Sequence, residues 1–161
     1  MPHVLGSDLD RGVQQVDDLV ERLVRSGVPS RRIFVAGFSQ GGALALAAAF
    51  KCRLPLGGVA VFSGFLPLPA LELDVAAGRP RSHCPLLWCH GDADANVPVQ
   101  LMRDGVQRLR RAGFCCVTAR EHAGLGHDMS GAAGVARSAA TPLTDFCTWL
   151  GAHSEEGTRV S

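Results

Sequence analysis

Residues 33–49 have the sequence IFVAGFSQGGALALAAA, in which a serine between glycines separates an apolar run from an alanine-rich segment. The apolar run predicts a β-strand and the alanine-rich segment predicts an α-helix, so the serine lies in the turn between them. The pentapeptide GFSQG, residues 37–41, matches the Gly-x-Ser-x-Gly pattern of a nucleophile elbow. In such a turn the serine adopts a strained backbone conformation, and glycines two positions before and after it supply room that a side chain would fill. Ser39 is therefore the first candidate nucleophile, and a serine in an ordinary glycine turn is the alternative.

The composition is that of one compact domain. The chain has 161 residues, 47% of them hydrophobic, which is enough to bury a core. We expect a single domain over residues 1–152 and a disordered tail over residues 153–161. The formal net charge is +1, and the arginines are scattered, with the highest density over residues 103–111 on one predicted helix. This distribution gives no support to nucleic-acid binding.

No feature of the sequence predicts secretion or a membrane span. Residues 1–8, MPHVLGSD, contain neither a basic nor a long apolar segment. No later stretch has the ~18 uninterrupted apolar residues that a membrane helix needs. We therefore expect a soluble, cytoplasmic protein.

The six cysteines predict reduced thiols, because most of them lie inside or beside apolar runs. Histidine adjoins cysteine at residues 83–84 and 89–90, which makes a zinc site an alternative. Neighbouring residues in a strand point to opposite faces, however, and the cysteines do not show the two-residue spacing typical of zinc ligands. We therefore expect no metal site, and nothing in the sequence implies a cofactor.

Apolar runs alternate with helical patterns along the chain. The predicted strands cover residues 32–36, 58–63, 86–89 and 115–119, and the predicted helices cover residues 7–26, 42–50, 99–112 and 135–150. This alternation predicts an α/β fold with a mostly parallel sheet and helices on both faces. Residues 66–84 form a long, proline-rich apolar loop, and loops of that length are usually functional or mobile.

A serine hydroxyl needs a base to accept its proton, and the base needs a carboxylate to orient it. HGDADANVP, residues 90–98, follows the third predicted strand, and GLGH, residues 124–127, follows the last one. Their side chains are thus expected at the carboxyl edge of the sheet together with Ser39, in the chain order serine, aspartate, histidine that α/β hydrolases have.

More than one residue could fill each of these positions. Asp92 and Asp94 are both candidate acids. His127 is a better candidate base than His122, because the glycines beside His127 let its ring swing toward the serine, whereas His122 lies in or beside the last strand. His90 is expected to stabilise its own loop.

These motifs resemble those of the acyl-protein thioesterase and lysophospholipase-like carboxylesterase family. The similarity extends over almost the whole chain, and its most specific segments are GFSQGG at 37–42, CHGDADANVP at 89–98 and G-x-x-H at 124–127. The resemblance implies an α/β hydrolase with Ser39 as nucleophile, His127 as base and the Gln40 backbone N–H as an oxyanion donor. The family spacing His-Gly-x-x-Asp-x-x-Val-Pro implies Asp94 as the acid instead of Asp92.

The resemblance also implies a substrate class. The leading expectation is the removal of palmitoyl groups from protein cysteines, with lysophospholipids or other carboxylic esters as alternatives. The expected partners are S-acylated proteins or small acyl esters, with transient contact to a membrane surface. SGFLPL, residues 63–68, resembles the segment that helps to line the acyl-chain groove, which makes Phe65, Leu66 and Leu68 candidate substrate contacts. Simple packing of this segment over the sheet is the alternative.

The sequence departs from the family pattern ahead of the first helix. Further strands and a His-Gly-x-Gly loop, whose backbone N–H is the second oxyanion donor, have no counterpart there. We therefore expect an N-terminally truncated form of the fold, in which residues 33–36 form a sheet edge that invites self-association. Losing one oxyanion donor typically costs ~10²–10³ in turnover. The alternative function is thus a weak or inactive fragment that binds acyl chains or a partner.

Overall fold

The computed structural model describes residues 6–67, 83–129 and 141–154. Four parallel strands form one sheet in chain order, namely β1 Phe34–Phe38, β2 Gly58–Phe62, β3 Leu86–Gly91 and β4 Val117–His122. The register aligns Phe38 with Phe62 and Gly91 with His122. Within the described residues, β1 pairs with β2 alone and lies at an edge of the sheet, where Ala36 and Phe38 are exposed.

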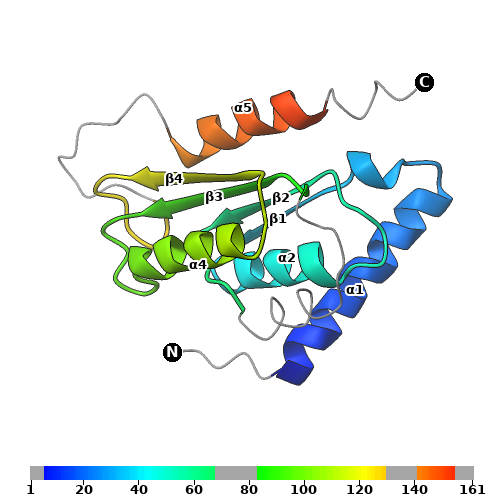
Figure 1. Ribbon diagram of the computed structural model, residues 1–161, viewed down its shortest axis with the longest axis horizontal. Helices are drawn as coiled ribbons and strands as arrows, with labels where there is room; N and C mark the ends of the chain where they lie inside the picture. The colour runs from blue at the N-terminus through cyan, green and yellow to red at the C-terminus, as the bar shows by residue number, and fades with distance from the viewer. Residues whose placement is uncertain (1–5, 68–82, 130–140, 155–161) are drawn as a thin grey trace.

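Helices cover both faces of this sheet (Figure 1). Helices α2 Gln40–Lys51 and α4 Val99–Arg111 pack on one face, and α1 Gly6–Arg25 packs against α2 from outside. Helix α5 Pro142–Ser154 packs on the opposite face. The α/β fold with a parallel sheet and helices on both faces is therefore confirmed. No helix among the described residues combines the length and the apolar character needed to cross a membrane.

The two faces of the sheet bury separate parts of the core. Trp88 of β3 is fully buried in the larger cluster, together with Leu46 of α2. Leu87 and Cys89, its neighbours in β3, pack on the other face with Trp149 of α5. Alternate residues of β3 thus enter opposite halves of the core, which is why residues 86–89 of this strand are continuously apolar.

Two strands begin two residues later than the sequence predicted. The 3₁₀ turn η1 Ser30–Arg32 precedes β1, so the strand starts at Phe34. Strand β4 starts at Val117, which is aligned with Leu86 of β3. Residues 115 and 116 were expected in this strand and instead lie in the loop before it.

The last helix also differs from its predicted limits. Residues 135–140, the expected first part, lie outside the described residues. Helix α5 continues to Ser154, past the expected domain end at residue 152. The reason is that the His153 ring packs on the Trp149 ring, with centroids 5.1 Å apart, and donates a hydrogen bond of 2.8 Å from Nδ1 to the Trp149 carbonyl.

Candidate active site

Ser39 lies in a sharp turn between β1 and α2. Its backbone has φ 53° and ψ −118°, a conformation that residues other than glycine rarely adopt. The Ser39 N–H donates to the Phe62 carbonyl at 2.8 Å, and the Ser39 carbonyl accepts from Gly42 N–H at 3.0 Å. These bonds fix the strained turn between the carboxyl end of the sheet and the first turn of α2.

The two glycines of the pentapeptide have different roles. A Cβ at Gly37 would lie 2.0 Å from the Gly41 carbonyl oxygen, so this position has no room for a side chain. A Cβ at Gly41 would meet nothing within 4 Å. The expectation that both glycines supply room for the turn is therefore wrong for Gly41, because its missing side chain would point into open space.

Replacing Gly37 with alanine is expected to lower the free energy of unfolding by about 1–3 kcal/mol, since the new methyl group overlaps a backbone oxygen that cannot move without opening the elbow. Gly41→Ala is the matched control and should change it by less than about 0.5 kcal/mol. Urea unfolding followed by circular dichroism measures both. Equal losses in the two variants would show that the close approach at Gly37 does not limit stability.

Asp94 follows β3 in a loop that its own side chain organises. Its carboxylate is fully buried, and Oδ1 accepts hydrogen bonds from the N–H groups of Asn96 at 2.9 Å and Val97 at 2.8 Å. Burial favours the neutral acid, but these two bonds and the contact with His127 outweigh burial and lower the pKa of Asp94. The carboxylate is therefore ionised at neutral pH.

His127 connects the acid to the serine. Its Nδ1 donates to Asp94 Oδ2 at 2.8 Å, and its Nε2 lies 3.0 Å from Ser39 Oγ, within hydrogen-bond distance. The imidazole packs against the Phe38 ring, with centroids 5.0 Å apart, and one-fifth of its surface is exposed. The structure thus brings together the serine, acid and base that the sequence proposed.

The loop that carries His127 is held against the end of β3. Gly124 has φ 70°, a conformation that favours glycine, and its N–H donates to Asp92 Oδ1 at 2.6 Å. The backbone of Leu125 lies so close to Gly91 that a Cβ on residue 91 would be 2.1 Å from the Leu125 carbonyl oxygen. Asp92, the alternative acid, therefore supports the histidine loop, whereas Asp94 receives the hydrogen bond from the histidine ring.

Of the other histidines, His90 and His122 have different partners. His90 is fully buried, donates from Nε2 to the Val97 carbonyl at 2.8 Å and lies 3.3 Å from Asp94 Oδ2. Its expected role in stabilising its own loop is confirmed. His122 ends β4 and lies on the α5 face, 3.3 Å from Asp145 Oδ2.

The predicted oxyanion donor and the predicted substrate contacts lie in different parts of the structure. Gln40 is the first residue of α2, directly after Ser39, so its N–H lies at the amino end of that helix. Phe65 is half-buried, and Leu66 belongs to the larger core cluster with 9% of its surface exposed. Leu68 lies outside the described residues.

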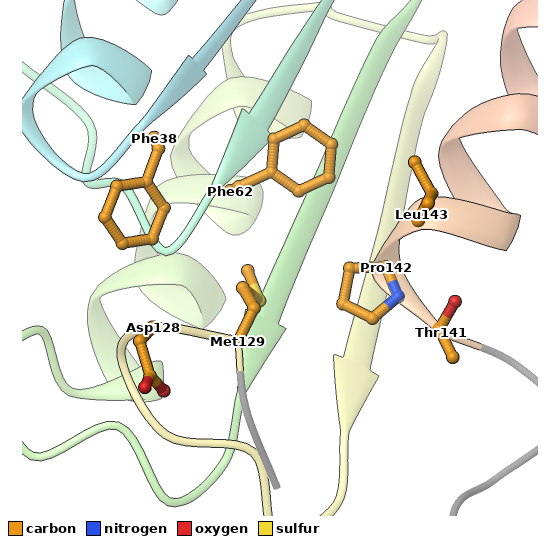
Figure 2. A pocket seen from close by; sticks show the side chains of 7 residues that line it. All are labelled: Phe38, Phe62, Asp128, Met129, Thr141, Pro142 and Leu143. Atoms are coloured by element: carbon orange, nitrogen blue, oxygen red, sulfur yellow. The ribbon is translucent and has the colours of Figure 1, made fainter.

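A pocket of about 340 Å³ lies on the α5 side of the sheet (Figure 2), and Phe38, which lines it, also packs against the His127 ring. Figure 2 shows Phe38, Phe62 and Met129 at one side and Pro142 and Leu143 at the other. The full lining is Phe38, Phe62, Asp128, Met129, Thr141, Pro142 and Leu143. Sequence reasoning missed this pocket, because its two sides are far apart in the chain. A usable signal was Phe38, a large apolar side chain at the variable position of the pentapeptide.

Comparison with known proteins identifies the family. Residues 6–133 match the phospholipase/carboxylesterase family. The chain belongs to that family. A probable carboxylesterase of Oryza sativa subsp. japonica is 40% identical over 120 residues, which are 74% of this chain and 44% of the relative. A probable inactive carboxylesterase of the same plant is 39% identical over 109 residues, which are 68% of this chain and 44% of the relative.

A solved structure of a similar protein agrees with the sheet and helices described above. The crystal structure of Zea mays acyl-protein thioesterase 2 matches with a TM-score of 0.72 and 25% identity, covering 92% of this chain and 65% of that one. This family member thus has the α/β hydrolase fold that the sequence predicted. The chain spans less than half the length of the two rice relatives.

Proposed function

We propose that this family member is a serine hydrolase of carboxylic esters and thioesters, with Ser39 as nucleophile, His127 as general base and Asp94 as the acid that orients it. The observation that supports the proposal is the unbroken contact from Ser39 Oγ to His127 Nε2 at 3.0 Å and from His127 Nδ1 to Asp94 Oδ2 at 2.8 Å. These are the distances that proton transfer from an activated nucleophile requires.

In the first half of the reaction, Ser39 Oγ attacks the acyl carbonyl carbon while His127 Nε2 accepts the hydroxyl proton. The negative charge moves to the carbonyl oxygen, and we assign the Gln40 N–H, at the amino end of α2, as the donor that stabilises it. When the tetrahedral intermediate collapses, the bond to the alcohol or thiol breaks, and the leaving group takes the proton from His127. The product of this half is an ester of Ser39.

In the second half, water attacks the acyl-serine carbonyl and His127 accepts a proton from that water. Collapse of this intermediate returns the proton to Ser39 Oγ and releases the carboxylic acid. Asp94 stabilises the imidazolium in both halves of the reaction. The lowered pKa of its carboxyl group keeps the group charged, and its Oδ2 lies 2.8 Å from His127 Nδ1.

For the substrate, we propose an acyl chain linked as an ester or thioester, with palmitoylated protein cysteines as the leading case. The mostly apolar pocket beside His127 supports a hydrocarbon group near the reacting atoms. The similarity to maize acyl-protein thioesterase 2 favours the thioester. A groove at Phe65 and Leu66, a cytoplasmic location and self-association through β1 stay predictions.

Labelling with a fluorophosphonate probe tests the proposal, because such a probe phosphonylates a serine only when the base activates it. We expect the folded protein to be labelled, with the adduct on the peptide that contains Ser39, and no labelling after heat denaturation. Ser39→Ala should abolish labelling. Ser63→Ala is a matched control, because Ser63 also has positive φ, 47°, but is fully buried, and it should label normally.

A second candidate function is an inactive protein that binds acyl chains without turnover. The likeness to a probable inactive carboxylesterase of rice favours it. Absence of labelling in wild-type protein that is shown to be folded by circular dichroism would contradict the hydrolase proposal and support this alternative. An adduct on any residue other than Ser39 would contradict the assigned nucleophile.

A further inference from the structure

We propose that His83, Cys115 and Cys116 bind one Zn²⁺ ion. The cluster lies at the amino ends of β3 and β4, because His83 comes three residues before Leu86 and the cysteines come directly before Val117. Since the strands are parallel, this end of the sheet is opposite the end that carries Ser39 (Figure 1). The metal site is thus separate from the candidate active site.

The distances between the ligand atoms fit a tetrahedral zinc ion. Cys115 Sγ lies 3.5 Å from His83 Nδ1 and 3.6 Å from Cys116 Sγ, and all three ligand atoms lie within 4.8 Å of one another. With Zn–S of about 2.3 Å and Zn–N of about 2.05 Å, the edges of a tetrahedron are about 3.6 Å for N···S and 3.8 Å for S···S. Two of the three edges are therefore within about 0.2 Å of the values that the ion requires.

The sheet itself holds the two halves of the site together. Leu86 N–H donates to the Cys116 carbonyl at 2.9 Å, and Val59 N–H donates to the Pro85 carbonyl at 2.8 Å. Both contributing segments are thus tied to the strands beside them. Two sulfurs from adjacent residues can serve one ion because β4 begins only at Val117, so the alternation of strand side chains does not apply to the cysteines.

The two sulfur atoms lie 3.6 Å apart, far more than the ~2.05 Å of a disulfide, so no bond joins them, and each must lose its proton to bind a metal as a thiolate. Thiolate and imidazole together select zinc-type ions over hard cations such as Mg²⁺ and Ca²⁺. His83 and Cys115 are exposed and Cys116 is half-buried, which leaves access for the ion and for a water molecule as fourth ligand.

A second cluster in the described residues has similar composition but suits a metal less well. Cys89, His122 and Asp145 also have ligand atoms within 4.8 Å of one another. Cys89 is fully buried, however, and burial raises the pKa of its thiol to about 12, which opposes the thiolate that a metal needs. The exposed cluster is therefore the better zinc site.

The test uses the full chain, freed of metal with a chelator and kept reduced. Titration with Co²⁺ as a spectroscopic substitute should give thiolate-to-cobalt charge-transfer absorption that saturates at one ion per chain, and Zn²⁺ should displace the cobalt. Cys115→Ser and His83→Ala should each weaken Zn²⁺ binding by more than about 100-fold. Losing a residue that only supports a metal ligand typically weakens binding by about 10–100-fold, so a larger loss indicates a direct ligand. Cys147→Ser, which removes an exposed thiol of α5 outside the cluster, should bind as the wild type does.

Each of three results would overturn the proposal. The first is absence of the charge-transfer band in wild-type protein whose thiols are shown to be reduced by reaction with a thiol reagent. The second is wild-type affinity in Cys115→Ser. The third is equal weakening by Cys147→Ser. If Cys115→Ser does not fold, as judged by circular dichroism, Cys116→Ser and zinc protection of the wild-type thiols against alkylation give the same decision.

Discussion

Replacing Asp94 with asparagine is expected to lower kcat by about 10⁴-fold, with little change in fold. Asparagine retains an oxygen for the N–H groups of Asn96 and Val97, so the loop keeps its hydrogen bonds. Its amide NH₂ would then face His127 Nδ1 as a donor, which favours the tautomer that carries its proton on Nε2. That nitrogen could no longer accept the proton of Ser39, and the uncharged amide would not stabilise an imidazolium.

Asp92→Asn is the matched control for this experiment. Asp92 accepts a hydrogen bond from Gly124 N–H through one oxygen, and an asparagine oxygen can do the same. We therefore expect kcat to fall by less than about 10-fold, in line with a supporting contact. Steady-state hydrolysis of a p-nitrophenyl ester at saturating concentration measures both variants. A larger loss in Asp92→Asn than in Asp94→Asn would contradict the proposed acid.

The candidate site was predictable from the sequence to the extent that topology determines it. In a parallel sheet, every segment that follows a strand reaches the same edge, so Ser39, Asp94 and His127 could be placed together without knowing any distance. The choice of Asp94 over Asp92 came from the family spacing. The structure gives that choice a physical reason. Asp94 accepts a hydrogen bond from the His127 ring, whereas Asp92 accepts one from the backbone of Gly124 in the loop that carries the histidine.

Features that depend on contacts between distant segments were not predictable in the same way. The pocket joins Phe38 to residues at the start of α5, about a hundred positions later in the chain. The cluster of His83 with the two cysteines depends on where β4 begins, and a shift of two residues changed which way those side chains could point. Apolar patterning defines the interior of a strand well but leaves its ends undetermined, because hydrogen bonds to neighbouring strands decide them.

Replacing Trp149 with alanine is expected to lower the free energy of unfolding by about 3–5 kcal/mol, a large part of the stability of a domain of this size. Trp149 is 6% exposed and anchors α5 to the sheet. Its ring lies so close to β2 that a Cβ at Gly58 would be 2.7 Å from it. It also packs edge-on against Phe34 and stacked on Phe146, with centroids 5.8 Å and 6.3 Å away. Truncation would leave a cavity between α5 and the sheet where the indole ring now packs.

Leu143→Ala tests whether the loss of stability comes from removing a buried side chain and not from any truncation of a large side chain in α5. Leu143 lies on the same helix with 68% of its surface exposed, so its truncation should change stability by less than about 0.5 kcal/mol. Urea unfolding of the two variants gives the comparison, and a loss below 1 kcal/mol in Trp149→Ala would contradict the anchoring role. Ser39, Asp94 and His127 come from segments other than α5. The folded fraction of Trp149→Ala should therefore still react with a fluorophosphonate. Such a result would show that Trp149 stabilises the packing of α5 without taking part in the chemistry at Ser39.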